Sequence, residues 1–239
     1  MGSAMLKGLQ RYSVEVVEKN PSKAKELQNL YPDIKLHSTA PDITDYIVIL
    51  AIKPQSLNSL TLKGEAKALI SILAGVNLET LKSKINAKYF VRAMPNIAAV
   101  KQKSITSLIG DIEFKDEAIE ILNSIGKSVW LNSEKELDIA TALGGSAPAW
   151  LGMVAEALSD GAVNLGLPRD KAYEYLPMLF AGVGALLEEN HPAILKDKVM
   201  SPAGTTAAGY SALERNGVRG SFIEAMSSAY KRAEELSKN

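Results

Sequence analysis

The chain has 239 residues, of which 46% are hydrophobic and 23% charged, and it contains two histidines and no cysteine. The absence of cysteine excludes disulfides, thiolate metal sites and a cysteine nucleophile, and two histidines are too few for a metal site built mainly from histidine. The 27 basic side chains balance 27 acidic ones, so the chain lacks the basic field that a nucleic-acid partner requires.

The first two-thirds of the sequence alternates β-type and helical segments. Val14–Val17 is a β-branched run, and Asn20-Pro21 then supplies an N-cap and a first helical residue for a helix over 22–30. Tyr46–Ile52 is apolar at every position, which indicates a strand buried on both faces of a parallel sheet. Further strands are predicted over 68–73, 89–94, 104–109 and 127–131, and a helix over 115–125. This alternation is typical of a doubly wound α/β domain.

Helical periodicity replaces the alternation near Ser133, where Ser133-x-x-Glu136 forms a capping box. Helices are predicted over 134–143, 147–165, 169–188 (with a kink at Pro177), 202–215 and 218–237. Apolar residues surround the third of these helices instead of occupying one face, which indicates the centre of a bundle or a surface shared with a second subunit. We therefore expect a sheet domain over residues 1–132 and an all-helical domain over residues 133–239.

The longest uncharged stretch lies between Asp138 and Glu156, but Gly144-Gly145-Ser146 and Pro148 interrupt it. A membrane-spanning helix needs about 20 predominantly apolar residues. Residues 1–10 also lack the apolar run of a signal peptide. We expect no membrane partner and a cytoplasmic location.

The first segment with a chemical implication is the N-terminal one, where Gly2-Ser3-Ala4 opens a helix over residues 1–9. A dinucleotide-binding unit runs strand, glycine-rich turn, helix, strand and then an acidic residue. Here the helix, the second strand and the acidic candidate Glu18 are present, whereas the preceding strand and the first two glycines are not. Glu18 would favour NAD by binding the ribose diol, and Lys19 would favour NADP by pairing with the 2′-phosphate. A solvated strand end and an ordinary N-terminus are the alternative interpretations.

Small and polar residues also follow the other predicted strands. Ala51, Lys53 and Pro54 follow the most apolar strand, and Pro95-Asn96 follows the strand over 89–94. Ligands of open α/β sheets bind beyond the carboxyl ends of the strands, so these residues are predicted to contact a cofactor. A simple turn at Asn96 is the alternative.

The helical region has two small-residue segments, Gly144–Ala149 and Ser201–Thr206, each at the predicted start of a helix. Exposed backbone N–H groups and hydroxyls at such a helix start suit a carboxylate or a phosphate. Ordinary helix caps that permit close packing are the alternative interpretation for both.

Together these segments resemble the pyrroline-5-carboxylate reductase family. The matching segments follow the order of the family motifs along the whole chain, and the last of them is the most specific: Met1–Leu9, Ala51–Gln55, Arg92–Asn96, Ala142–Trp150, Glu156–Ala162, Gly166–Arg169 and Asp197–Gly209.

The resemblance implies a Rossmann-like doubly wound sheet domain, with its first strand missing, followed by an all-helical dimerisation domain. It implies an imine reductase that transfers a hydride from NADPH or NADH, with NADPH favoured, to Δ1-pyrroline-5-carboxylate. The product is L-proline, so the reaction is the last step of proline biosynthesis. It also implies homodimers through the helical domain, which in many members assemble into decamers.

The resemblance also assigns roles to single residues. It places Gly2, Ser3 and Ala4 at the cofactor phosphates, Lys53 and Pro54 beside the cofactor, and Asn96 near the nicotinamide and the substrate. It places Ser146, Pro148, Ser201 and Gly204 around the substrate. Thr206 is expected at the substrate nitrogen, and Thr205 with the amides around Gly204 at the substrate carboxylate.

Several departures leave other functions open. The missing strand and glycines suggest a shortened chain, or a cofactor-impaired, non-catalytic oligomeric relative. Ala147 and Ala203 stand where the family has glycine, which changes the expected width of the substrate pocket. An oxidoreductase of the β-hydroxyacid dehydrogenase type is the remaining alternative. It would need a lysine in the helical domain, and the predicted helix over 147–165 contains none.

Overall fold

The computed structural model of the protein describes residues 1–237. The chain divides into two compact units, which we call the sheet unit (residues 1–146 together with the C-terminal residues from Ala229) and the helical unit (Ala147–Ser228). The helix α5 (Glu134–Ala140) packs with the sheet unit, although the expected domain boundary at 132/133 precedes it. That boundary stays a prediction about which parts of the chain fold independently.

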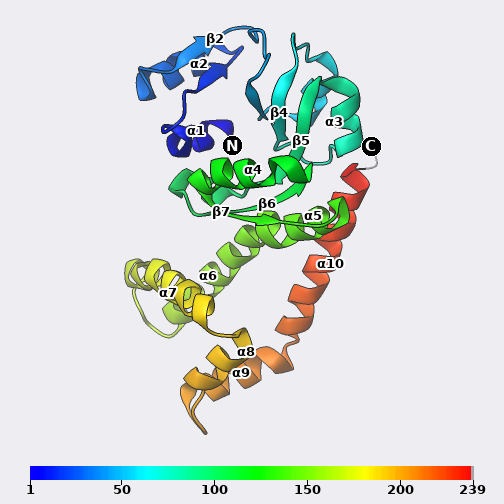
Figure 1. The fold of residues 1–239 in the computed structure, drawn as a ribbon. Coiled ribbons are helices and arrows are strands. Elements are labelled where there is room, and N and C mark those ends of the chain that lie inside the picture. The colour runs from blue at the N-terminus through cyan, green and yellow to red at the C-terminus, as the bar shows by residue number, and fades with distance from the viewer. Residues whose placement is uncertain (238–239) are drawn as a thin grey trace. The chain divides into compact units, whose positions relative to one another are not determined.

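Parallel strands make up most of the sheet unit, as the alternation predicted (Figure 1). A five-stranded sheet has the order β3-β4-β5-β6-β7, and β1 and β2 form a separate parallel pair. The strands are β1 (Glu15–Val17), β2 (Lys35–His37), β3 (Ile47–Leu50), β4 (Ala66–Ser71), β5 (Ala87–Met94), β6 (Ser104–Gly110) and β7 (Gly126–Trp130). The predicted strands are confirmed, and β2 is an additional one.

Because β1 and β3 belong to different sheets, each has one edge without a strand partner among the described residues. The Tyr46 hydroxyl, just before β3, donates to the Glu15 carboxylate of β1 at 3.1 Å. The prediction that the Tyr46–Ile52 run is buried on both faces is confirmed in part. Ile47 and Ile49 pack against the core on one face and Val48 and Leu50 against the core on the other, but only Leu50 is fully buried and Tyr46 and Ile52 are exposed. The open edge of β3 explains this exposure, because a strand at the edge of a sheet is covered less completely than one inside it.

Helices cover both faces of the five-stranded sheet and give the unit two cores. On one face α1 (Gly2–Leu9) and α4 (Lys115–Leu122) pack on alternate strand residues, including Ile70, Val91 and Leu108. On the other face α3 (Leu78–Lys84) and the 3₁₀ helix η1 (Pro54–Ser59) pack on Leu69 and Phe90. This alternation of neighbouring residues between two faces is the period of two that a strand imposes.

One pair of strands departs from the parallel arrangement, because β6 runs antiparallel to β5. Only residues 95–103, including the 3₁₀ helix η2 (Ile97–Lys101), connect the two strands. A parallel crossover needs about a dozen or more residues, so this short connection turns the chain back on itself.

The helix starts largely follow their capping signals. Asn20 caps α2 (Pro21–Leu30) by accepting from the Ser22 and Lys23 amides, and Ser133 accepts from the Glu136 amide at the start of α5. The predicted helix over 134–143 is shorter as an α-helix, because residues Thr141–Ser146 form a π-helical turn.

The helical unit contains α6 (Ala147–Asn164), α7 (Arg169–Glu189), α8 (Pro192–Val199), α9 (Thr205–Arg215) and most of α10 (Val218–Ser237). Pro177 lies inside α7, and α8 is a helix that the sequence patterns did not predict. The prediction that the helix after α8 begins at residue 202 is wrong, since Ser201–Gly204 forms a turn and α9 begins at Thr205. Among the described residues, no helix is both long enough and apolar enough to cross a membrane.

Candidate active site

The residues predicted to hold the cofactor phosphates lie at the start of α1, next to the carboxyl end of β3. Gly2 is so close to Ala51 that a Cβ atom on Gly2 would stand 3.2 Å from the Ala51 Cβ. The first backbone bonds of α1 run from the Ala4 and Met5 amides to the Met1 carbonyl, so the Gly2 and Ser3 amides lack intrahelical partners. This arrangement joins a helix start to a strand end, as a phosphate site requires.

Glu18 and Lys19 follow β1, as predicted. The Glu18 carboxylate accepts from the Asn20 amide at 2.8 Å, next to the start of α2. Glu18 therefore has a local structural role at the end of β1, whereas Lys19 is exposed.

Lys53 and Pro54 lie at the start of η1, directly after β3. The Lys53 side chain is exposed, and Pro54 is half-buried in the first turn of η1. Because β3, β4 and β5 are parallel, their carboxyl ends share one edge of the sheet. Ala51, Lys53 and Asn96 therefore lie along the edge where cofactors bind in open α/β sheets.

Asn96 follows β5, and its side chain makes two hydrogen bonds within the protein. Its Oδ1 accepts from the Ala98 amide at 3.0 Å, and its Nδ2 donates to the Gly144 carbonyl at 3.0 Å. The Asn96 amide also donates to the Ser104 hydroxyl. Asn96 is thus a half-buried link between the end of β5 and the π-helical turn.

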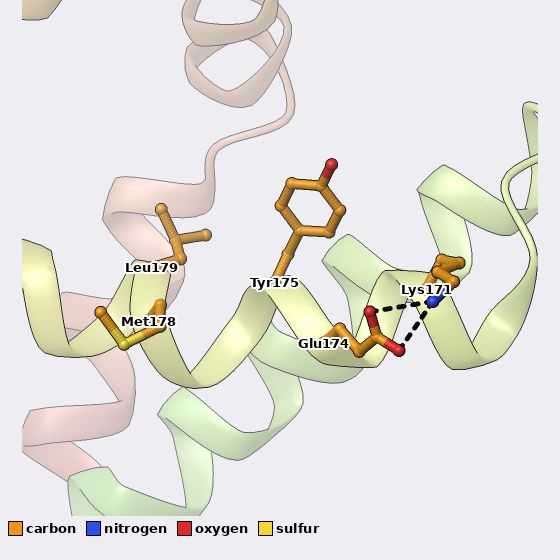
Figure 2. A pocket seen from close by; sticks show the side chains of 5 residues that line it. All are labelled: Lys171, Glu174, Tyr175, Met178 and Leu179. Atoms are coloured by element: carbon orange, nitrogen blue, oxygen red, sulfur yellow. Dashed lines mark hydrogen bonds and ion pairs between the residues drawn. The ribbon is translucent and has the colours of Figure 1, made fainter.

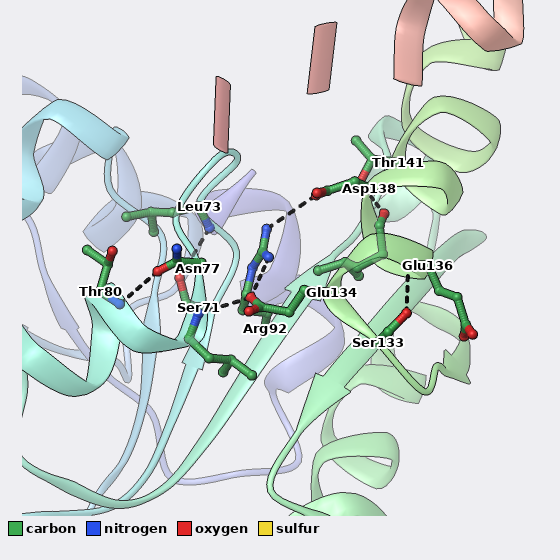
Figure 3. Close-up of polar contacts among 12 residues, drawn as sticks. Ser71, Leu73, Asn77, Thr80, Arg92, Ser133, Glu134, Glu136, Asp138 and Thr141 are labelled. Carbon is green, nitrogen blue, oxygen red and sulfur yellow. Dashed lines mark hydrogen bonds and ion pairs between the residues drawn. The ribbon is translucent and has the colours of Figure 1, made fainter. Parts of the chain in front are cut away.

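A buried arginine lies at the same strand end and was given no role by the sequence patterns (Figure 3). Arg92 of β5 is 2% exposed and donates to the Glu134 carboxylate at 2.6 Å, while Asp138 lies 3.7 Å away. Burial raises the pKa of Asp138, Arg92 opposes this rise, and the charges of Glu134 and Glu234 add to it. An arginine inside the otherwise apolar run Phe90–Met94 was the signal that the sequence offered, because a buried guanidinium requires carboxylate partners.

The predicted substrate residues Ser201, Gly204, Thr205 and Thr206 lie together at the start of α9. The Gly204 amide donates to the Ser201 carbonyl at 3.1 Å and closes a turn in which Ala203 has a φ of 58°. A Cβ on Gly204 would lie 2.3 Å from the Ser201 hydroxyl oxygen, so this position accepts only glycine without rearrangement. The turn therefore holds the Ser201 hydroxyl against the backbone that leads into α9.

The backbone at the start of α9 offers donors to a ligand. The first intrahelical bond of α9 runs from the Ala208 amide to the Gly204 carbonyl, so the preceding amides lack helical partners. A hollow of about 300 Å³ lies here, lined by Asp197, Met200, Ser201, Pro202 and Ala207. Amides at a helix start attract a carboxylate, and hydroxyls can both donate and accept.

The predicted residues therefore fall into two groups. The cofactor group (Gly2 to Ala4, Glu18, Lys19, Ala51, Lys53, Pro54 and Asn96) belongs to the sheet unit, and Ser201–Thr206 belongs to the helical unit. Ser146 is the last residue of the sheet unit, and Pro148 lies in the first turn of α6. Asp197, Met200 and Ala207 line the hollow beside Ser201 without having been assigned to the site in advance.

A second hollow, of about 590 Å³, lies along α7 and is lined by Lys171, Glu174, Tyr175, Met178 and Leu179 (Figure 2). Lys171 and Glu174 pair with each other at 2.9 Å. The other three residues are exposed and apolar or aromatic. Exposed apolar surface of this kind is typical of a protein–protein contact, and this hollow offers no group suited to reduction.

Comparison with known proteins gives one consistent result. Residues 134–236 match the family model described as pyrroline-5-carboxylate reductase dimerisation. The chain is 35% identical to the pyrroline-5-carboxylate reductase of Helicobacter pylori strain J99, over 97% of this chain and 95% of that protein.

Solved structures agree with the sequence comparison. The 1-pyrroline-5-carboxylate reductase of Streptococcus pyogenes has a TM-score of 0.84 at 29% identity, covering 98% of this chain and 95% of that one. The pyrroline carboxylate reductase of Plasmodium falciparum, solved with NADP bound, has a TM-score of 0.77 at 25% identity, covering 99% and 96%. The protein described here belongs to the pyrroline-5-carboxylate reductase family.

Proposed function

We propose that this chain is a pyrroline-5-carboxylate reductase, which reduces the C=N bond of Δ1-pyrroline-5-carboxylate to give L-proline. The observation that carries the proposal is the Ser201–Gly204 turn at the start of α9, which gathers hydroxyls and unpaired amides in a chain of this family. The helical unit also lacks the lysine in α6 that a β-hydroxyacid dehydrogenase would need.

The sheet unit fits a dinucleotide at two places. The Gly2 and Ser3 amides at the start of α1 lack intrahelical partners and can donate to phosphates, and the 51–54 segment lies at the carboxyl edge of the sheet. We assign Gly2, Ser3 and Ala4 to the phosphates, and Ala51, Lys53, Pro54 and the turn at Asn96 to the remainder of the cofactor. When bound, the nicotinamide supplies the hydride.

The helical unit supplies substrate orientation. The amides at the start of α9, with Thr205, hold the substrate carboxylate, and the Thr206 hydroxyl lies at the ring nitrogen. We also assign Ser146, Pro148, Ser201 and Gly204 to substrate binding. An iminium substrate is already electrophilic, so the protein needs to exclude water and hold the reacting groups close together, without a strong general acid.

We assign NADPH as the preferred cofactor. The Glu18 carboxylate already accepts from the Asn20 amide, which leaves it less available to a ribose diol. Lys19 is exposed beside it, and a lysine at this place suits a 2′-phosphate. The relative from Plasmodium falciparum carries NADP, which agrees with this assignment.

The apolar exposed surface of α7 supports a homodimer through the helical unit, with larger assemblies such as a decamer built from dimers. Tyr175, Met178 and Leu179 are exposed on this helix, and the dimerisation family matches the region that contains them. A cytoplasmic location remains the expectation from the sequence.

The direct test is an assay of the purified, assembled protein with Δ1-pyrroline-5-carboxylate and either NADPH or NADH, following the absorbance of the reduced cofactor. We expect turnover with both and a higher kcat/KM with NADPH. An assembled protein that binds NADPH and gives no turnover would contradict the proposal.

The alternative function is that of an oligomeric relative with impaired cofactor binding. A fluorescence titration with NADPH separates the two functions, because an impaired relative would show no saturable binding at micromolar concentrations.

Thr206 offers a test at one residue. We expect Thr206→Val to lower kcat/KM about tenfold or more, since the substrate nitrogen loses its hydroxyl partner, and Thr206→Ser to retain most activity. Equal activity of the valine variant and the unaltered protein would remove Thr206 from the site.

A further inference from the structure

The side chain of Asn96 is engaged at both ends inside the protein. Its Oδ1 accepts from the Ala98 amide at 3.0 Å, and its Nδ2 donates to the Gly144 carbonyl at 3.0 Å. The second bond joins residues that are 48 positions apart in the sequence. Since a helix cap needs only the Oδ1 atom, the donor bond to Gly144 requires a separate explanation.

The partner of this bond lies in the π-helical turn Thr141–Ser146. A π-helical turn is a rare local widening of a helix that often occurs at functional sites. This one contains Gly144 and Gly145, which restrict the backbone little, and it ends at Ser146, the residue assigned above to the substrate pocket. The turn therefore needs contacts from elsewhere to fix where Ser146 lies.

A second contact fixes the other end of the same helical segment (Figure 3). Arg92 of β5 donates to Glu134 at 2.6 Å, and Glu134 also accepts from the Leu78 amide at 3.0 Å. Arg92 and Asn96 both lie at the carboxyl end of β5. One strand end thus holds the first residue of α5 through Arg92 and the π-helical turn through Asn96.

We propose that Asn96 is a positioning residue, whose bond to the Gly144 carbonyl sets the place of Ser146 for the reduction. The proposal rests on the proposed function. The backbone of the Pro95-Asn96 turn lies at the cofactor edge of the sheet, while the Asn96 side chain acts on the substrate through the π-helical turn. Cofactor and substrate positions are thereby coupled through one side chain.

The test replaces one atom of the side chain. Asn96→Asp keeps the oxygen that accepts from the Ala98 amide and removes the donor to Gly144. Asn77→Asp is the matched control, because Asn77 also caps a helix at the carboxyl edge of the sheet, with its Oδ1 accepting from the Thr80 amide at 2.7 Å. Both variants introduce the same charge at a helix N-terminus, where aspartate is an equally good cap.

We expect Asn96→Asp to lower kcat/KM for Δ1-pyrroline-5-carboxylate about tenfold or more, with less than about a twofold change in the Kd of NADPH. Asn77→Asp should leave both near their original values. A comparable loss of NADPH affinity in Asn96→Asp would overturn the proposal in favour of direct cofactor contact. Unchanged kcat/KM would overturn it altogether.

Hydrogen exchange of the ligand-free protein gives a readout that does not depend on turnover. Loss of the bond to Gly144 should increase amide exchange within residues 141–146 in Asn96→Asp, whereas Asn77→Asp should leave that peptide unchanged. If the unaltered protein gave no turnover, the proposed function would fail, while this comparison would still report whether Asn96 holds the turn. Unchanged exchange in both variants would contradict the positioning role.

Discussion

The two units of the chain bury their side chains to very different extents. The sheet unit closes two cores of its own, in which residues such as Leu69 and Leu108 are fully buried. Within residues 147–228, in contrast, only Ser159 and Ala172 are buried. Because both units are rich in apolar residues, the difference lies in what covers them. Helices of the same unit cover both faces of the sheet. The apolar residues of the helical unit are exposed in the single chain and are therefore available for contact with another surface.

This difference separates two sources of stability. A unit with its own core is stable at any protein concentration, whereas a unit completed by a second copy depends on mass action. The apolar exposed surface of α7 illustrates the second case, since Tyr173, Val183 and Leu187 lie along this helix and are all exposed.

The largest effect is expected from Leu179→Asp on α7, a residue that is 48% exposed in the single chain. A charge buried without a partner in an apolar interface is strongly unfavourable, so the variant should be monomeric and lose activity more than about 100-fold. Analytical ultracentrifugation measures the assembly. Ile112→Asp, at an exposed apolar residue of the sheet unit, is the control and should leave assembly intact. A dimeric Leu179→Asp would remove α7 from the interface.

Leu108→Ala tests the other side of the comparison. Leu108 of β6 is fully buried beneath the helices that cover this face of the sheet. Its truncation should lower the free energy of unfolding by about 2–5 kcal/mol. Denaturant unfolding at two protein concentrations measures this loss. It should be the same at both, since the sheet unit does not need a partner to close its core. A concentration-dependent loss would mean that the sheet unit too is completed by assembly.

Within the helical unit, relief of backbone strain should be measurable as a change in the free energy of unfolding, because few side chains are buried there. Ala203 has a φ of 58°, in the left-handed region that disfavours residues with a Cβ. Ala203→Gly should therefore raise the free energy of unfolding by up to about 1 kcal/mol. Gly217→Ala is the mirror control, since Gly217 has a φ of 69° with open space around it, and it should destabilise by a similar amount. If Ala203→Gly were no more stable than the unaltered protein, the turn would not be strained.

The sequence predicted most of this architecture where the signal was local. Asn20 and Ser133 cap their helices as expected, and the apolar runs became strands. The Lys35–His37 strand was missed because one apolar residue between two polar ones carries no period. The start of α9 was misplaced because Pro202 reads equally well as a first helical residue or a turn residue.

The candidate site likewise has a part that local sequence patterns predicted and a part that they missed. The family motifs led to Ser201–Thr206 and to the strand ends of the sheet unit. They did not lead to the bond between Asn96 and Gly144 or to the pairing of Arg92 with Glu134, because both join residues more than 40 positions apart. Such contacts depend on how the strand and the helix pack, which no local pattern contains.

The smallest predicted effects compare one carboxylate from each unit. Burial raises the pKa of Asp138 in the sheet unit, whereas hydrogen bonds from Arg219 and Tyr210 lower the pKa of Glu214 in the helical unit. A raised pKa means that the folded state binds its proton more tightly than the unfolded state. Asp138 therefore reduces stability as pH rises from the ordinary aspartate pKa through its own. Glu214 adds stability above the ordinary glutamate pKa, and this is lost as pH falls through its lowered value.

The two amide variants should consequently respond to pH in opposite directions. Relative to the unaltered protein, Asp138→Asn should gain stability at pH 7 and lose that gain as the pH approaches the ordinary aspartate range. Glu214→Gln should be less stable at pH 7, and this deficit should shrink in acid. Chemical denaturation of the three proteins across this pH range measures both effects. If Asp138→Asn were destabilised at pH 7, the attraction of Arg92 for Asp138 would outweigh its burial, and the sheet unit would hold this carboxylate as favourably as the helical unit holds Glu214.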